Sequence, residues 1–521
     1  MFVFSSEVGL MAFFIPWVVS IIAFIVFLVL VFKTASYETT RKRIFGVIAG
    51  LTGAFFITGI VLMAIPPKAY QISTPEDLIA LEEYADGISV GFHANEGKKA
   101  ELTNDIDFEG FDFETINLKW NDVCIDGNGY TIKNITYTSY EENEEDGIGL
   151  FIGDISLKNI TFENIYLSYH GQTSSVGGFV GVGGDIFENV TISGKIDAPN
   201  ATNVGGMVGE VYYDTKIINC TSEMEINGKM NVGGFVGFDA GGGEQTLKNC
   251  KNLGTVKGSE NVGGIIGKTS VQVSDCENLG EVKGSTAVGG IVGYVNKGAS
   301  VSNSKNSSAV TGNIQVGGIA GFLLKDARID DCVNLEGAKV TGISADSDGN
   351  SKVGGIVGET EKETNVYNCK NQGEVASNDS RVGGIVGFAC GSITNCKHEG
   401  SVVGGSDVGG IVGNYKSSTM ISTCEVTGSV TGNTRVGGII GRIGSDNFRT
   451  KLNKWIYSEE IPLMNCLVSG NIKAGSYGGG IIGMIVNDKV EGDYLETNEF
   501  MGKVFVGGAE TTNLWNVYLE R

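Results

Sequence analysis

A short block of residues, Val-Gly-Gly-Ile-Val-Gly, repeats along most of this 521-residue chain. It is complete at Val353, Gly354, Gly355, Ile356, Val357 and Gly358, and again at 382–387 and 408–413. Most copies begin about 28 residues after the one before, at Val176, Val204, Val232, Val262, Val288, Val316, Val353, Val382, Val408 and Val436, with degenerate copies at Ile148, Gly478 and Val506. A fixed step of this kind is typical of solenoids, in which each repeat adds one coil to a stack. We therefore expect one elongated body.

A second column of residues stands twelve positions before the block. It contains Cys220, Cys250, Cys276, Ser304, Cys396, Cys424 and Cys466, with Cys369 displaced by one and Cys332 joining once the insertion after it is discounted. Two positions later stand Asn252, Asn278, Asn306, Asn334 and Asn371, and His398 takes this place in the next repeat. Because side chains alternate along a strand, both columns face the same side. We expect asparagines that hydrogen-bond from coil to coil, and cysteines that fill the interior as free thiols.

Metal sites and disulfides are the alternatives for the cysteine column. Metal sites favour clustered Cys-x-x-Cys or histidine partners, and only Cys390 and Cys396 are close in sequence, without that spacing. Neighbours in a parallel column point side by side, which is poor geometry for a disulfide. We expect neither a metal nor another cofactor.

Columns of equivalent residues predict an all-β fold, a parallel β-solenoid of about 13 coils and roughly 60 Å length. A propeller is less consistent with the sequence, because its blades need about 40 residues each. The expected boundaries are a membrane hairpin at 1–67, a helical cap with irregular first coils at 68–123, the regular solenoid at 124–510 and a C-terminal cap at 511–521. A helix start is predicted at Ser73 and Thr74, because Pro75, Glu76 and Asp77 follow.

Two apolar stretches precede this body. Residues 10–32 and 44–66 each contain 23 residues without a charge, enough for a helix that crosses a bilayer. The loop between them carries Lys33, Arg41, Lys42 and Arg43, so the positive-inside rule places it in the cytoplasm. A cleaved signal peptide is the alternative, but the first stretch is too long and lacks a basic flank. We expect a two-helix transmembrane hairpin with both termini and the solenoid outside the plasma membrane.

The repeat, preceded by Asn-Cys-x-Asn-x-Gly-x-Val-x-Gly, resembles the GLUG-motif repeat of bacterial surface proteins, which include IgA-specific metallopeptidases and adhesin-like proteins. The lead-in segments at 102–107, 126–132 and 149–153 are also similar to that family. The resemblance implies a surface-exposed, right-handed β-helix and carries over no catalytic residue. The zinc motif HExxH of the peptidases is absent, because Val402 follows His398 and Glu399 where the second histidine is required.

A longer insertion between Gly441 and Asn465 is the candidate ligand-binding site. It brings cations and aromatic residues together on an acidic chain: Arg442, Phe448, Arg449, Lys451, Lys454, Trp455 and Tyr457. Such side chains are frequent at binding sites for glycans and proteins. The alternative is a loop folded back on the rod, with Trp455 as its plug.

The formal net charge of -22 argues against nucleic-acid binding, because phosphate backbones would be repelled. Polysaccharide lyases and hydrolases also use β-helices, but the acidic residues here recur without a concentrated group. We therefore expect no enzyme. The sequence predicts a membrane-anchored, adhesin-like or envelope interaction protein with a glycan or surface-protein ligand. The alternative is a passive stalk.

Overall fold

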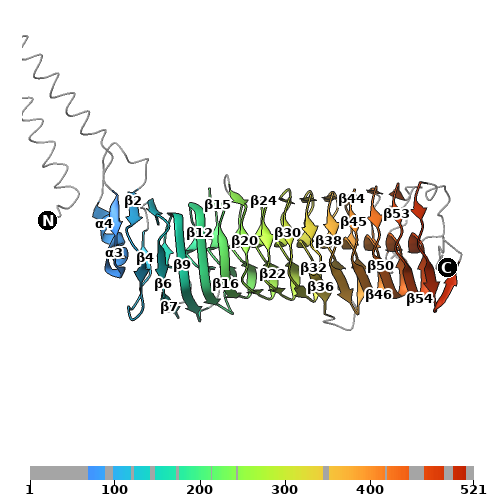
Figure 1. Ribbon diagram of the computed structural model, residues 1–521, viewed down its shortest axis with the longest axis horizontal. Coiled ribbons are helices and arrows are strands. Elements are labelled where there is room, and N and C mark those ends of the chain that lie inside the picture. The colour runs from blue at the N-terminus through green and yellow to red at the C-terminus, as the bar shows by residue number, and fades with distance from the viewer. Residues whose placement is uncertain are drawn as a thin grey trace, which may run out of the picture.

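The computed structural model describes residues 69–87, 98–118, 122–140, 147–171, 175–212, 214–241, 245–343, 351–416, 419–444, 463–485 and 497–511. This part of the chain forms a parallel β-solenoid, a rod along which chain order follows the long axis (Figure 1). The expected all-β solenoid is confirmed. The apolar stretches 10–32 and 44–66 lie outside the described residues. Among the helices that are described, none combines the length and apolarity needed to cross a bilayer.

Two sheets run the length of the rod. The smaller has 13 parallel strands, one for each coil, in agreement with the number expected from the repeat. These strands are β4 (Ile116–Asn117), β8 (Phe151–Ile152), β11 (Val180–Val182), β14 (Val208–Val211), β18 (Val236–Asp239), β23 (Ile266–Thr269), β28 (Val292–Val295), β33 (Ala320–Leu323), β38 (Val357–Thr360), β43 (Val386–Ala389), β47 (Val412–Tyr415), β51 (Ile440–Ile443) and β55 (Ile482–Ile485).

The larger sheet joins 45 strands and wraps the other faces of the rod. One coil shows the order: β23 is followed by β24 (Gln272–Ser274), β25 (Glu277–Asn278), β26 (Val282–Lys283) and β27 (Thr286–Gly289). The strands equivalent to β27, which contain the start of each block, are β10 (Ser175–Gly177), β13 (Asn203–Gly205), β17 (Met230–Gly233), β22 (Glu260–Gly263), β32 (Ile314–Gly317), β37 (Val353–Gly354), β42 (Ser380–Gly383), β46 (Ser401–Gly409), β50 (Ser429–Gly437) and β54 (Ile472–Gly479).

Register follows the repeat. The first valines of successive blocks are direct partners, as Val262 is with Val232 and Val288. The long step between the blocks at Val316 and Val353 comes from an insertion between β36 (Lys339–Gly342) and β37. The insertion does not change the register, because Val316 still pairs with Val353. The valines and isoleucines of the blocks are fully buried. Their β-branched side chains favour strands and fill a narrow interior.

The glycines of the block are required by close packing. A Cβ on Gly354 would lie 2.0 Å from the Val357 carbonyl oxygen, and one on Gly355 would lie 2.2 Å from the Gly384 carbonyl oxygen of the next coil. Neither glycine has a positive φ. The left-handed corners are instead occupied by residues such as Asn395, with φ 57°, directly before the cysteine column. Asparagine tolerates this conformation better than most residues.

The ends of the described rod are less regular. Strand β1 (Tyr70–Ile72) already pairs with β2 (Lys98–Leu102), so coiling begins before the helices α3 (Pro75–Ile79) and α4 (Leu81–Gly87). The helices were expected as a cap within 68–123, and in the chain they follow β1, the first strand of the stack. Helix α3 starts where the sequence predicted, with Thr74 in a capping box. At the other end, β57 (Val504–Val506) pairs antiparallel with β58 (Ala509–Thr511).

Candidate ligand-binding surface

The asparagine column forms a buried hydrogen-bonded ladder. The side-chain Nδ2 of each asparagine donates to the Oδ1 of the next coil, at 2.8 Å from Asn252 to Asn278 and 2.9 Å from Asn306 to Asn334. At the end of the ladder, Asn371 Nδ2 donates to His398 Nδ1 at 3.1 Å. Each of these side chains is fully buried. The ladder satisfies amides inside the rod, so it is structural.

Replacing Asn306 by alanine is expected to lower the free energy of unfolding by about 2 kcal/mol, because two buried groups each lose a hydrogen bond. Asn278 Nδ2 would keep only the Gly280 carbonyl as its acceptor, and Asn334 Oδ1 would lose its donor. Chemical denaturation followed by circular dichroism measures the change. The control is Asn313→Ala, which removes a 3.1 Å bond to Ser285 Oγ at a half-buried site. Equal losses in the two variants would contradict the ladder's contribution.

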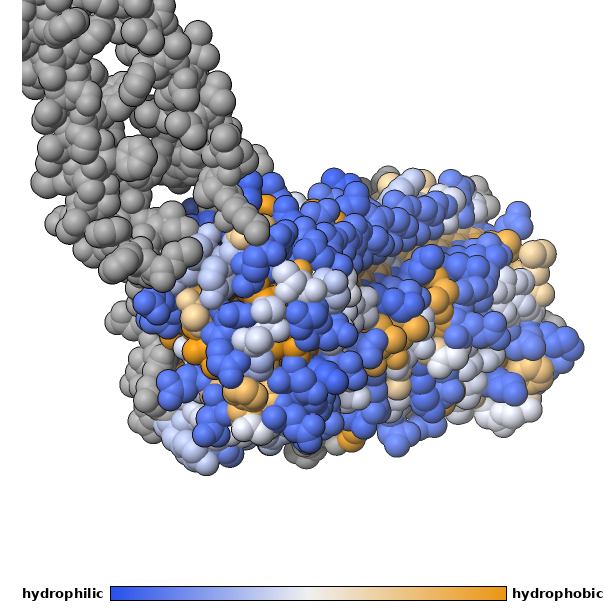
Figure 2. Space-filling view, turned by 60° about the vertical axis from the view of Figure 1, so that its left-hand side comes forward, coloured by the Kyte–Doolittle hydropathy of each residue, from blue (hydrophilic) through white to orange (hydrophobic). Residues whose placement is uncertain are grey.

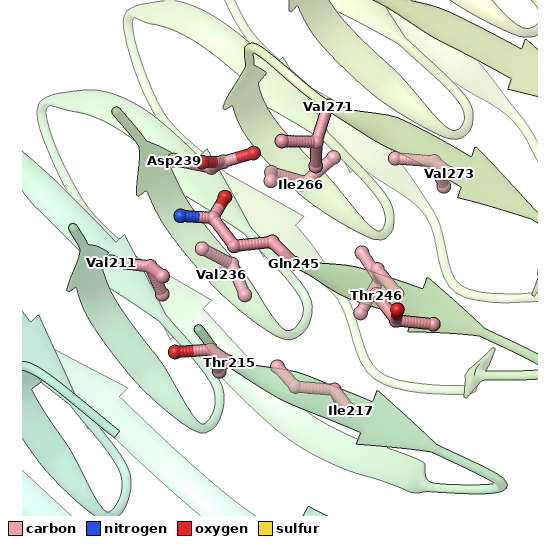
Figure 3. Close-up of a pocket in the computed structure, with 11 residues that line it drawn as sticks. Val211, Thr215, Ile217, Val236, Asp239, Gln245, Thr246, Ile266, Val271 and Val273 are labelled. Atoms are coloured by element: carbon pink, nitrogen blue, oxygen red, sulfur yellow. The ribbon is translucent and has the colours of Figure 1, made fainter. Parts of the chain in front are cut away.

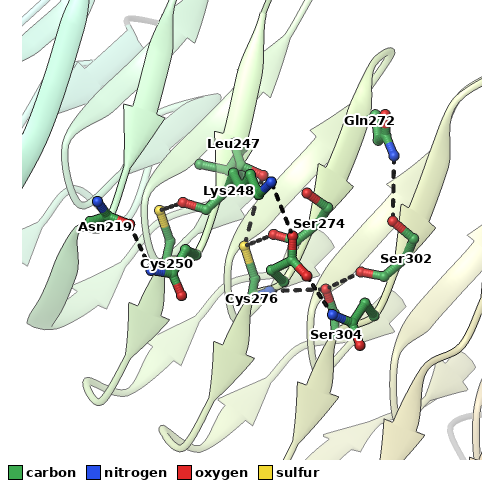
Figure 4. Close-up of polar contacts among 12 residues, drawn as sticks. Asn219, Leu247, Lys248, Cys250, Gln272, Ser274, Cys276, Ser302 and Ser304 are labelled. Atoms are coloured by element: carbon green, nitrogen blue, oxygen red, sulfur yellow. Dashed lines mark hydrogen bonds and ion pairs between the residues drawn. The ribbon is translucent and has the colours of Figure 1, made fainter.

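The cysteine column is also structural. Its eight cysteines are buried and free, and in Figure 4 Cys250, Cys276 and Ser304 occupy successive coils. Cys276 Sγ donates to the Ser274 carbonyl at 3.1 Å, and Ser304 Oγ donates to the Ser302 carbonyl at 2.8 Å. Burial raises the pKa of the Cys250 and Cys369 thiols well above the usual value. Protonated, enclosed thiols are poor nucleophiles and poor metal ligands.

A small cavity lies between the two sheets in the coils of β18 and β23 (Figure 3). Its lining is mostly valine and isoleucine, and its polar members are Thr215, Asp239, Gln245 and Thr246. Asp239 accepts hydrogen bonds from Gly241 N at 2.8 Å and Thr269 Oγ1 at 3.2 Å, and burial raises its pKa. The volume of 20 Å³ suits about one water molecule. A sugar or cofactor does not fit.

The insertion site predicted from sequence is described at one residue only. Phe448, Arg449, Lys451, Lys454, Trp455 and Tyr457 lie outside the described residues. Arg442 was expected as a cation of the insertion, and the structure places it at the start of that segment, within a regular coil. It belongs to the regular strand β51, its side chain is 3% exposed, and it lies 3.9 Å from Asp407. Arg442 instead occupies a column position that recurs in every coil.

That column and one beside it run side by side along the rod, with half-buried members among buried ones such as Ala287, Phe322 and Asp407, and we call them the outer strip. The first column contains the residue directly after each Val-Gly-Gly-x-x-Gly block: Val182, Glu210, Phe238, Lys268, Tyr294, Phe322, Glu359, Phe388, Asn414, Arg442 and Met484. The second contains the residue directly before each block: Ser175, Asn203, Asn231, Asn261, Ala287, Gln315, Lys352, Arg381, Asp407, Arg435 and Tyr477.

Hydrogen bonds join the two columns. Near the N-terminal end, Glu210 Oε2 accepts from Ser175 Oγ and from Asn203 Nδ2, each at 2.8 Å. Further along, Gln315 Nε2 donates to Glu359 Oε2 at 2.5 Å. Asn414 Nδ2 donates to Asp407 Oδ2 at 3.1 Å. The two columns are therefore linked side by side in several coils.

Aromatic rings and a cation stack along the centre of the outer strip. Lys268 Nζ lies 5.4 Å from the ring centroid of Phe238 and 5.0 Å from that of Tyr294. In the next coil, the Tyr294 and Phe322 centroids are 5.0 Å apart. We call these four residues the aromatic–cation row. It spans four successive coils, at about 4.8 Å per step.

The strip continues with ion pairs and a second aromatic residue. Lys352 pairs with Glu359, and Lys352 Nζ also lies 5.5 Å from the ring centroid of Phe388. The guanidinium carbon of Arg381 lies 5.7 Å from the same centroid. On the face seen in Figure 2, apolar side chains gather in patches between polar rows. Such mixed surfaces are typical of interaction sites.

Comparison with known proteins gives little further guidance. No family model matches the chain, and no curated protein matches it. A similar solved structure is a crystal structure described as a putative immunoglobulin A1 protease from Bacteroides ovatus, at 17% identity and a TM-score of 0.28. The match covers 66% of this chain and 77% of that chain. The resemblance to GLUG-motif repeats stays a prediction.

The described coils offer little that could serve in catalysis or metal binding. No group of three or more His, Cys, Asp and Glu side chains there is placed to hold a metal ion. His170 lies at the surface beside Tyr140, with ring centroids 5.0 Å apart, and His398 belongs to the buried ladder. His93 lies outside the described residues. Neither described histidine is part of the outer strip.

Proposed function

We propose that this chain is a membrane-anchored protein of the bacterial cell surface whose β-solenoid binds an extended ligand, in the manner of an adhesin. The apolar stretches 10–32 and 44–66 support the anchor, since each is long enough to cross a bilayer. The aromatic–cation row carries the binding proposal, because aromatic and cationic side chains dominate the energy of many interfaces. A passive stalk, the alternative, needs no such row.

The carboxylates of the described outer strip favour binding over hydrolysis. Cleavage of a glycosidic bond uses two carboxylates that flank the bond. Here Glu210 is held by Ser175 and Asn203, and Glu359 by Lys352 and Gln315. Glu210 and Glu359 already have partners and are five blocks apart along the rod, and the third carboxylate of the strip, Asp407, is paired with Arg435. Our proposal therefore contains no catalytic step.

Replacing both Phe238 and Tyr294 by alanine is expected to weaken ligand binding by about tenfold or more, because buried aromatic contacts dominate hot spots. The full-length chain in lipid nanodiscs is screened on an array of polysaccharides and extracellular matrix proteins. Affinity is then measured by biolayer interferometry for any polymer that gives saturable binding.

Two further variants locate the site. Trp455→Ala tests the insertion predicted from sequence, and Tyr130→Ala removes an exposed aromatic residue that belongs to neither column of the outer strip. Loss of binding in the Phe238/Tyr294 variant alone supports the outer strip. Loss in Trp455→Ala alone moves the site to the insertion. A folded wild-type protein that binds nothing on the array would favour the passive stalk.

A further inference from the structure

We propose that the ligand of the outer strip is an acidic polysaccharide, lying along the rod with a carboxylate on the Lys268 ammonium group. This inference rests on the proposed binding function and adds the chemical class of the ligand. Three observations support it: the contacts of the aromatic rings, the contacts of the Lys268 ammonium group, and the charge of the strip.

The rings of Phe238 and Tyr294 are half-buried, and each has a face covered by Lys268 Nζ. The Tyr294 and Phe322 rings are coil neighbours at 5.0 Å, tilted by 41°, and Phe322 is buried. These ring faces are therefore partly occupied by contacts between coils. The edges that remain carry the positive part of the ring quadrupole. Such edges favour oxygen-rich and anionic groups.

Lys268 has no carboxylate partner among the described residues. Most neighbouring lysines do have one, as Lys251 has Glu277 at 3.4 Å and Lys283 has Glu281 at 2.8 Å. The contacts of Lys268 are the two aromatic rings, which hold the ammonium group in a fixed, half-buried position. A positioned cation without an internal counter-ion is suited to an anion supplied by a ligand.

The charge of the strip is opposite to that of the whole chain. Between Asn231 and Phe388 the two columns contain three cations, Lys268, Lys352 and Arg381, and one carboxylate, Glu359. The chain as a whole has a formal net charge of -22. An anionic ligand would be repelled from most of the rod and attracted to this strip.

The spacing of the charges separates polysaccharides from other anionic polymers. A nucleic acid carries a phosphate at each nucleotide, whereas the aromatic–cation row offers one cation in four coils. An extended peptide would add to an open sheet edge, but the strands of this row are paired on both sides within the rod. A glycan with acidic sugars among neutral ones fits a row of this composition.

The test compares polysaccharides that differ only in charge. Full-length protein in nanodiscs is presented with an array of uronate-containing polysaccharides, each paired with its carboxyl-reduced form, and with poly(dT). We expect saturable binding to at least one uronate polymer, loss of binding after carboxyl reduction, and weaker binding at high salt. Lys268→Met should weaken binding about tenfold, the loss of one charged hydrogen bond. Lys268→Arg should retain most of it.

Lys283→Met is the matched control, because it removes the same charge from an exposed position away from the strip. It should change affinity by less than about twofold. Equal binding of acidic and reduced polymers, still lost in the Phe238/Tyr294 variant, would overturn the acidic ligand and leave the binding function intact. Tighter binding of poly(dT) would also overturn it. Failure to bind any polymer would overturn both proposals.

Discussion

Replacing Gly354 by alanine is expected to lower the free energy of unfolding by at least about 3 kcal/mol, at the upper end of overpacking effects. The new Cβ would lie 2.0 Å from the Val357 carbonyl oxygen, 2.7 Å from the Ile385 carbonyl oxygen and 2.8 Å from Gly387 N. All three atoms are backbone, so no side chain can rotate away. The methyl group can be accommodated only if the backbone of its own block shifts and the next coil moves away.

A solenoid is stabilised by contacts between neighbouring coils, so the damage should be local. Hydrogen exchange is expected to accelerate most in the amides of β37 and β42, while distant coils change little. Denaturation followed by circular dichroism gives the total loss. The control is Gly298→Ala, where nothing lies within 4 Å of the new Cβ although φ is +76°. Backbone strain alone should cost about 1–2 kcal/mol there. A Gly354 variant as stable as this control would contradict the packing argument.

Much of the fold could be predicted because each coil of a solenoid repeats the same packing and strand pairing. Val353 and Val382 are equivalent in sequence and direct partners in the sheet, so one alignment gave both the period and the register. The cysteine and asparagine columns followed from strand alternation. The ends were harder, because they lack the period: the sequence did not indicate that β1 precedes the helices and already pairs with β2.

The candidate surface was missed because its columns vary. Core positions are restricted to a few apolar residues, whereas the position after each block holds glutamate, phenylalanine, lysine or tyrosine in different coils. Only the stacking of neighbouring coils joins Phe238, Lys268 and Tyr294 into a row. The row could have been found from the sequence by aligning the repeats and comparing the residue directly after the block in each successive coil. Sequence reasoning favoured the insertion instead, and so assigned Arg442 to it.

At the end of the asparagine ladder, His398 is the group expected to make stability depend most on pH. Its side chain is fully buried at the end of the asparagine ladder, and Nε2 has no hydrogen-bond partner. Burial lowers the pKa of His398 to about 4, against a small opposing effect of Glu399. The unfolded chain takes up this proton near pH 6.5, the ordinary value, whereas the folded chain does so only near pH 4. The unfolded state therefore binds more protons between these values.

The contribution of His398 to the free energy of unfolding is thus expected to fall by about 3 kcal/mol as the pH falls from about 6.5 to 4. His398→Asn is the matched variant, because asparagine keeps an acceptor for Asn371 Nδ2 and does not titrate. Acidic residues elsewhere contribute equally to both proteins, so the difference in unfolding free energy between pH 7 and pH 4 isolates His398. An NMR titration of the three histidines gives its pKa directly. Parallel pH profiles for the two proteins would show that His398 is not held neutral, and that the ladder's end is open to a proton.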